Sequence, residues 1–236
     1  MNIYAIIVGV EHYDALLDDV NIELDGPASD AVRFASWLLN RGVPPGNLRL
    51  FISALNPAAQ RNELNKACNG AGVPILEATR DQVEAFFNTD LTKLAKAPST
   101  LYVLWGGHGV IRGGHEHHLF YRNFRKGSPL TFNVETRLRQ LRAVANLSFQ
   151  HVFIDACANY VELTQFGGVD SATPLIDDPD PTVKQDLIRA AASGQKAQND
   201  NIKRTGYFSR ELFALLDQHP ADNWPTAEYL AHSTEY

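Results

Sequence analysis

A histidine and a cysteine in this chain lie in settings that suit nucleophilic catalysis. His108 stands in the sequence GGHG and Cys157 in DACAN, each directly after an apolar run. A thiol becomes a strong nucleophile at neutral pH when a neighbouring imidazole takes its proton or stabilises the thiolate. The tetrahedral intermediate that follows needs backbone donors, and the amides of Gly109 and Cys157 are the candidates by position. The chemistry expected is therefore attack by Cys157 with His108 as the general base.

The elements that must position this pair are strands of a parallel sheet. Apolar runs rich in β-branched and aromatic residues predict buried strands at 3–10, 48–52, 100–105 and 151–155. Helical patterns separate them, at 28–39, 79–94 and 133–147. Such an alternation predicts an α/β fold, with a mainly parallel central sheet and helices on both faces. The loops after parallel strands emerge at one edge, so His108 and Cys157 can meet there.

The chain after Cys157 has a different character. Glycines, prolines and the acidic stretch DDPDP predict a flexible linker at about 161–185. A strand at 187–192 and a helix at 207–216 follow, and the tail at 220–236 shows weak periodicity. A chain of 236 residues can be built around one core, so we expect a single domain over 1–236.

Composition narrows the classes of partner. The formal charge of −6 and pI near 5.7 argue against nucleic acid as a direct partner. The apolar N-terminus has neither a basic leader nor a small-residue cleavage site, so we expect no signal peptide and no membrane partner. Two cysteines, Cys68 and Cys157, are too few for a disulfide framework. A reducing cytoplasm is the expected location.

The motifs resemble those of caspases and metacaspases. The caspase pattern places a histidine about 50 residues before its Q-A-C motif, and here the interval is 157 − 108 = 49. The resemblance covers residues 2–216 and is carried by six ordered blocks: YAIIVGVEHYD, LDGPASDAVRFASWLLNRG, YVLWGGHG, HVFIDACAN, AAASGQKAQ and GYFSRELFALL. It implies a caspase-like three-layer sandwich, with His108 and Cys157 as the catalytic dyad.

The residue two before the cysteine distinguishes the subfamilies. Caspases have glutamine there, whereas metacaspases have aspartate, and this chain has Asp155. A second acidic group of the metacaspase pocket corresponds to Asp30, in the block LDGPASDA. The resemblance thus implies a pocket for Arg or Lys. Two carboxylates in that pocket would bind the basic side chain and would repel an acidic one. The wall of the pocket would lie near Ser193, Gly194 and Gln195.

The chain departs from the metacaspase D-x-C-H-S-G motif at Ala158 and Asn159. It looks more similar to bacterial caspase-like proteins related to metacaspases. This resemblance implies an endopeptidase that cleaves after Arg or Lys and acts as a regulated effector or activator in defence, antiviral defence included, or in programmed cell death. The implied partners are a protein substrate encoded nearby and an upstream activator. Relatives are processed in the linker as zymogens, and Lys184 is the nearby basic residue for self-processing.

Metal sites have weak support in the sequence. The cluster His115, Glu116, His117 and His118 lacks the H-E-x-x-H spacing and follows two glycines, so a hairpin beside the active site is favoured over zinc. Asp177, Asp178 and Asp180 lack the glycine and terminal glutamate of a calcium loop. No metal and no required cofactor are therefore expected. Calcium, which some metacaspases need, stays open.

Alternative functions remain open at the level of sequence. An inactive caspase-like scaffold could bind partners without cleaving them, and a Cys-His hydrolase of small molecules would ignore basic peptides. Structural roles are also open for the acidic residues, since Asp155 could cap a turn and Asp30 could be a solvated helix residue. Cys68 suits a small buried hydrophobe.

Overall fold

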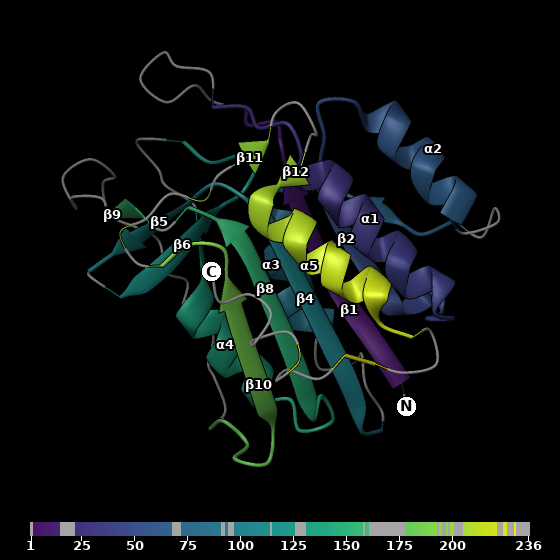
Figure 1. Cartoon of the computed structure of the whole chain (residues 1–236). Helices are drawn as coiled ribbons and strands as arrows, with labels where there is room; N and C mark the ends of the chain where they lie inside the picture. Colours follow the sequence, from purple (N-terminus) through teal and green to yellow (C-terminus); the bar gives the residue numbers. More distant parts are fainter. Residues whose placement is uncertain are drawn as a thin grey trace.

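The computed structural model contains a central sheet of six parallel strands (Figure 1). The residues it describes are 2–14, 22–67, 72–90, 93, 97–113, 115–125, 131–157, 159–160, 178–192, 194, 197, 199–200, 205–220, 224–225 and 229, with backbone alone at 159–160 and 199–200. The spatial order of the strands is β10 (Lys184–Arg189), β8 (Phe149–Ala156), β4 (Ser99–Gly107), β1 (Asn2–Val10), β2 (Leu48–Ser53) and β3 (Ile75–Leu76).

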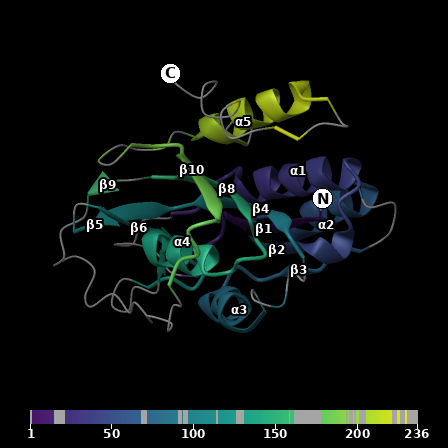
Figure 2. The same ribbon diagram turned by 90° about the horizontal axis from the view of Figure 1, so that it is seen from below.

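Helices cover both faces of this sheet (Figure 2). Because β1, β4 and β8 are buried on both sides, they are rich in apolar residues, although β8 also carries the buried Gln150, His151 and Asp155. One face packs against α1 (Pro27–Asn40) and α5 (Tyr207–Gln218), through residues such as Phe34 and Phe213. The opposite face packs against α3 (Arg80–Ala85), the π-helical turn η2 (Phe86–Asp90) and α4 (Val134–Arg142). The predicted three-layer α/β architecture is confirmed.

A smaller sheet extends from the carboxyl edge of β4. Its strands lie in the order β7 (Thr131–Asn133), β6 (Glu116–Phe120), β5 (Gly109–Arg112) and β9 (Asn159–Tyr160). The hairpin predicted around the histidine cluster is present, because β5 and β6 pair antiparallel. A separate pair, β11 (Asn199–Asp200) and β12 (Thr205–Gly206), leads into α5.

Several bounds differ from the sequence prediction. The strand expected at 187–192 is β10, which begins at Lys184, so the linker does not extend to 185. This edge strand, KQDLIR, has only two apolar residues, which stand side by side, and such a sequence gives a weak strand signal. The helix α2 (Pro57–Ala67) was not predicted, because its largely polar sequence buries few side chains beyond Leu64 and Gln60. The short helix η1 (Pro45–Asn47) precedes β2.

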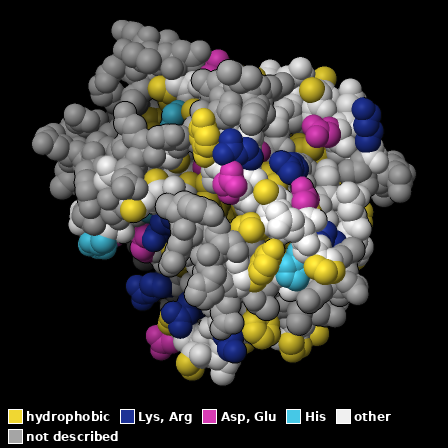
Figure 3. Space-filling view, in the orientation of Figure 1, with side chains coloured by type: hydrophobic (Ala, Val, Ile, Leu, Met, Phe, Trp, Pro, Cys, Tyr) yellow, Lys and Arg dark blue, Asp and Glu magenta, His cyan; other side chains and the backbone are white. Residues whose placement is uncertain are grey.

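Charges of both signs alternate on the face of the molecule seen in Figure 3. Ion pairs among the described residues include Arg33 with Asp217 at 2.9 Å and Arg210 with Glu211 at 2.8 Å. In the part of the chain that the structure describes, no helix has the length and apolar character needed to cross a membrane.

Candidate active site

The predicted catalytic residues meet where the strand order reverses. From β1 the chain proceeds to β2 and β3 on one side and then returns to β4 and β8 on the other. Ligands of open α/β sheets bind at the carboxyl ends of strands at such a switch point. A cavity of about 50 Å³ lies there, and its lining includes His108, Cys157, Asp30 and Asp155. The two predicted catalytic residues and the two predicted pocket acids therefore border one space.

His108 follows β4 and is held by two contacts that the sequence did not predict. Its Nε2 lies 2.7 Å from the carbonyl oxygen of Ile22, and its backbone N–H donates to the hydroxyl of Tyr13 at 2.8 Å. The Tyr13 ring also packs on the imidazole, with 5.2 Å between centroids. A carbonyl oxygen only accepts, so the neutral ring carries its proton on Nε2 and its lone pair on Nδ1. Burial lowers the pKa of His108, which favours this neutral form, although the bond to Ile22 acts in the opposite direction.

Cys157 follows β8 and is a free, partly buried thiol. Its Sγ lies 3.7 Å from the carbonyl oxygen of Ala197. Gly109 lies directly against this loop, since a Cβ at Gly109 would come within 2.8 Å of the Cys157 carbonyl oxygen and of His117 Nε2. Only glycine therefore fits at 109 without separating the two loops. The structure thus brings the two predicted oxyanion donors, Gly109 and Cys157, close together.

The two carboxylates of the cavity hold the start of α5. Asp155 Oδ2 accepts from the backbone N–H and the hydroxyl of Ser209, at 3.1 and 2.6 Å. Asp30 accepts from the hydroxyl of Thr205 at 2.7 Å and from the amide of Gly206 at 3.0 Å. A carboxylate that bonds the free amides in the first turn of a helix is a capping group. Asp155 therefore caps α5, not the turn before Cys157, and Asp30 is buried and not solvated.

Burial governs the electrostatics of these acids. Loss of water raises the pKa of Asp30 from 3.8 to about 7, against the hydrogen bonds from Thr205 and Gly206, which lower it. The negative charge of Asp155 also raises the Asp30 pKa. Burial likewise raises the pKa of Asp155, and the bonds from Ser209 oppose that shift. A cationic ligand between the two carboxylates would restore their charged forms.

The remaining predicted site residues are more dispersed. Ser193 and Gln195 lie outside the described residues, and Gly194 is exposed with φ of 87°. Lys184 is the exposed first residue of β10, where its amide donates to Ser148 and its ammonium lies over the Phe149 ring. Asp177 also lies outside the described residues, while Asp180 accepts from Thr182 in a local turn. Across the described residues, no group of three or more His, Cys, Asp or Glu side chains could hold a metal ion.

Sequence reasoning missed the residues that support the dyad. Tyr13 and Ile22 act through a hydroxyl and a backbone carbonyl, which leave no spacing signal. Glu11 is fully buried and accepts backbone N–H groups from Gly26, Ala28 and Leu55 at 3.0–3.1 Å, which ties together the loops after β1 and β2. The signal for Glu11 in the sequence was its position, since an acidic residue that directly follows an apolar strand can be buried with it.

Comparisons with known proteins show the fold. The solved structures that are similar include caspase-1 from Spodoptera frugiperda, at 14% identity and a TM-score of 0.57, over 92% of this chain and 69% of that one. Protein GSU0716 from Geobacter sulfurreducens is similar at 15% identity and a TM-score of 0.57, over 92% of this chain and 82% of that one. No family model matches the sequence, and no curated protein does. The chain therefore has a caspase-like fold, with its candidate site at the carboxyl edge of the central sheet.

Proposed function

We propose that this protein is a cysteine endopeptidase that cleaves after Arg or Lys through an acyl-enzyme on Cys157. One observation carries the proposal: a single cavity is lined by the thiol, the imidazole and both carboxylates. A scaffold without chemistry has no need for a neutral histidine and a free thiol at one cavity, whereas the two acids would also serve a scaffold by holding the start of α5.

The first half of the reaction forms the acyl-enzyme. Nδ1 of His108 takes the thiol proton, and the thiolate attacks the carbonyl carbon of the substrate, forming a C–S bond. The amides of Gly109 and Cys157 would donate to the resulting oxyanion. The C–N bond then breaks as His108 returns the proton to the leaving amine. Water hydrolyses the thioester in the second half, with His108 again as the base, and the thiol is regenerated.

Asp30 and Asp155 would provide the specificity for a basic side chain. A guanidinium or ammonium placed between them gains charge-assisted hydrogen bonds, whereas an acidic side chain would face two carboxylates. In this structure the same oxygens bond Thr205, Gly206 and Ser209. The cavity of about 50 Å³ is also far smaller than the roughly 300 Å³ of the smallest ordinary ligand pockets. Substrate must therefore displace the start of α5.

This closed pocket favours a regulated enzyme. We propose a zymogen in which an upstream activator, calcium, or self-processing after Lys184 opens the pocket. Because Lys184 pairs in β10, cleavage after it would require that strand to leave the sheet. The same proposal includes a protein substrate encoded nearby and a role as an effector or activator in bacterial defence or programmed cell death, in the cytoplasm. These parts rest on the sequence resemblance alone.

Hydrolysis of fluorogenic peptides ending in Arg, Lys or Asp tests the function directly. The native chain is compared with Cys157→Ala and His108→Ala, each with and without calcium. We expect cleavage after Arg and Lys that is lost in both variants. Cleavage after Asp would overturn the acidic pocket and keep the peptidase. Hydrolysis of simple esters alone would indicate a small-molecule hydrolase. No hydrolysis of any substrate, even with calcium, would favour a zymogen that awaits its activator or the inactive scaffold.

A further inference from the structure

A second cavity, of about 410 Å³, lies at the carboxyl ends of β1, β2 and β3. Its volume is within the range of pockets that bind small ligands or side chains. The lining combines charged groups, among them Glu23, Glu77, Arg61 and Arg122, with an apolar wall that includes Leu55 and Ile75. None of these residues takes part in the chemistry proposed above, so the cavity needs an explanation of its own.

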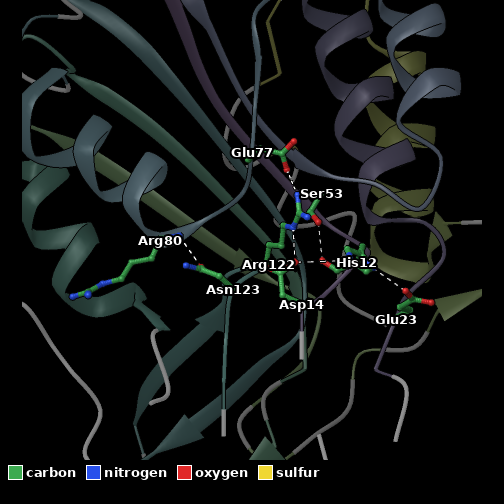
Figure 4. A network of polar contacts seen from close by, with 8 residues as sticks. All are labelled: His12, Asp14, Glu23, Ser53, Glu77, Arg80, Arg122 and Asn123. Carbon is green, nitrogen blue, oxygen red and sulfur yellow. Dashed lines mark hydrogen bonds and ion pairs between the residues drawn. The ribbon is translucent and has the colours of Figure 1, made fainter. Parts of the chain in front are cut away.

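Most charges at this cavity already have partners (Figure 4). His12 Nδ1 lies 2.8 Å from Oε1 of Glu23. Arg122 bonds two acids: its Nε donates to Asp14 Oδ1 at 2.8 Å, and its Nη1 donates to Glu77. Each acid of the network therefore faces a basic group. A cationic ligand would have to break one of these pairs to bind.

Two groups on α2 lack such partners. The exposed guanidinium of Arg61 has no ion pair or hydrogen bond within the described part of the chain. The side chain of Gln60 is 3% exposed, and its Oε1 has no hydrogen-bond partner among the described residues. Beside them Leu55 is 42% exposed, which leaves apolar surface open to a ligand. A glutamate side chain would pair its carboxylate with Arg61 and cover Leu55 with its aliphatic stem, while a backbone N–H of the same peptide could donate to Gln60 Oε1.

The cavity lies beyond His108 on the side away from Cys157. The strand order places Cys157 after β8, His108 after the adjacent β4, and His12 after β1. His12 precedes Tyr13 and Glu23 follows Ile22, the two residues that hold His108. In thiol acylation the acyl carbon bonds the sulfur and the leaving amine receives its proton from the imidazole. The leaving segment of a peptide would therefore extend past His108 toward this cavity.

We propose that this cavity is the subsite for the leaving-group side of a peptide substrate, and that Arg61 gives it a preference for an acidic residue. The proposal rests on the peptidase function proposed above. It assigns the chain two specificities, a basic residue before the cleaved bond and an acidic one after it. Arg61 is accordingly a specificity residue and does not take part in bond cleavage.

Internally quenched peptides test this preference. Each carries Arg before the bond and Glu, Gln or Lys at the first, second or third position after it, and each ends in an amide so that no terminal carboxylate competes for Arg61. We expect kcat/KM for Glu to exceed that for Lys by about two- to fivefold at one position, as for an exposed ion pair. Arg61→Glu should reverse the order. Lys66→Glu, the same charge change on α2 away from the cavity lining, should keep it.

The outcomes separate the two proposals. Equal rates for Glu, Gln and Lys at all three positions in the native chain, or an unchanged order in Arg61→Glu, would overturn the subsite while the peptidase stands. Failure to cleave every peptide, both in the native chain and in Gly206→Ala, where the added methyl group should open the pocket, would overturn the peptidase, and the subsite with it.

Discussion

The carbonyl oxygen of Cys157 lies 2.9 Å from Nε2 of the buried His117, on β6. Burial lowers the pKa of His117 to about 4, so the ring is neutral at ordinary pH. Because the carbonyl can only accept, the neutral ring donates its Nε2–H and thereby fixes the peptide group that follows the thiol. His117 is thus a positioning residue for Cys157, provided by the hairpin next to the site.

Replacing His117 with Phe should slow the reaction at Cys157. Loss of one hydrogen bond costs about 1 kcal/mol, which predicts roughly a fivefold decrease in kcat with a smaller change in KM. Alkylation of Cys157 by iodoacetamide, followed between pH 5 and 9, measures the thiol without a substrate. His117→Gln retains a donor near the Nε2 position and should recover most of the rate. His115→Phe, on the exposed turn of the same hairpin, is the control. Equal behaviour of the Gln and Phe variants would show that the donor is unimportant.

The fold could be predicted from sequence because the strands that form its centre are unambiguous. Strands β1, β4 and β8 are almost wholly buried, and each stands out as an apolar run. The two loops that carry His108 and Cys157 end adjacent parallel strands, so their meeting followed from topology alone. Strand β10 and helix α2 could be predicted only poorly, because partly buried elements carry mixed sequences.

The site was less predictable where backbone and distant chain segments provide the contacts. Asp30 and Asp155 were identified by motif, yet their partners come from residues 205–209, at the start of α5. No local pattern indicates that a carboxylate from β8 will cap a helix more than 50 residues later. The Ile22 carbonyl could not be found for the same reason, since every residue has one.

Cleavage after Arg should depend on pH through Asp30. With its pKa raised to about 7, Asp30 gains its charge as the pH rises from 6 to 8, so kcat/KM for an Arg peptide should rise over that interval. Asp30→Asn should remove this dependence and lower kcat/KM at pH 8 by about 10- to 100-fold, the worth of a charged hydrogen bond. A native profile that is flat between pH 6 and 8 would contradict this assignment.

The same group should affect stability with a defined sign. Because the folded pKa of Asp30 is above its unfolded value, the folded state binds the proton more tightly, and stability falls as the pH rises from about 4 to 7. The full shift corresponds to at most about 4 kcal/mol. Urea unfolding across this range should therefore show Asp30→Asn gaining stability relative to the native chain as the pH rises. A constant difference between the two would exclude a raised pKa.

Glu11 should be a major contributor to stability. Its carboxylate accepts three backbone N–H groups, and Glu11→Gln turns one oxygen into a donor that faces the amide of Leu55. We expect a loss of about 1–3 kcal/mol in the free energy of unfolding, measured as a lower urea midpoint at an unchanged m-value. Glu63→Gln, at an exposed position on α2, should stay within about 0.5 kcal/mol of the native chain. Similar midpoints for the two variants would contradict the structural role of Glu11.

Gly206 tests whether the start of α5 closes the acidic pocket. A Cβ at this position would lie 1.9 Å from Asp155 Oδ2, although the backbone, with φ of −66°, would accept alanine. Gly206→Ala should therefore force the segment away from Asp155 and cost about 1–3 kcal/mol of stability, as overpacking does. Gly46→Ala has open space around its Cβ and should stay within about 0.5 kcal/mol. If Gly206→Ala is as stable as the native chain, then Thr205, Gly206 and Ser209 do not hold the two carboxylates in solution, and the pocket stands open without an activator.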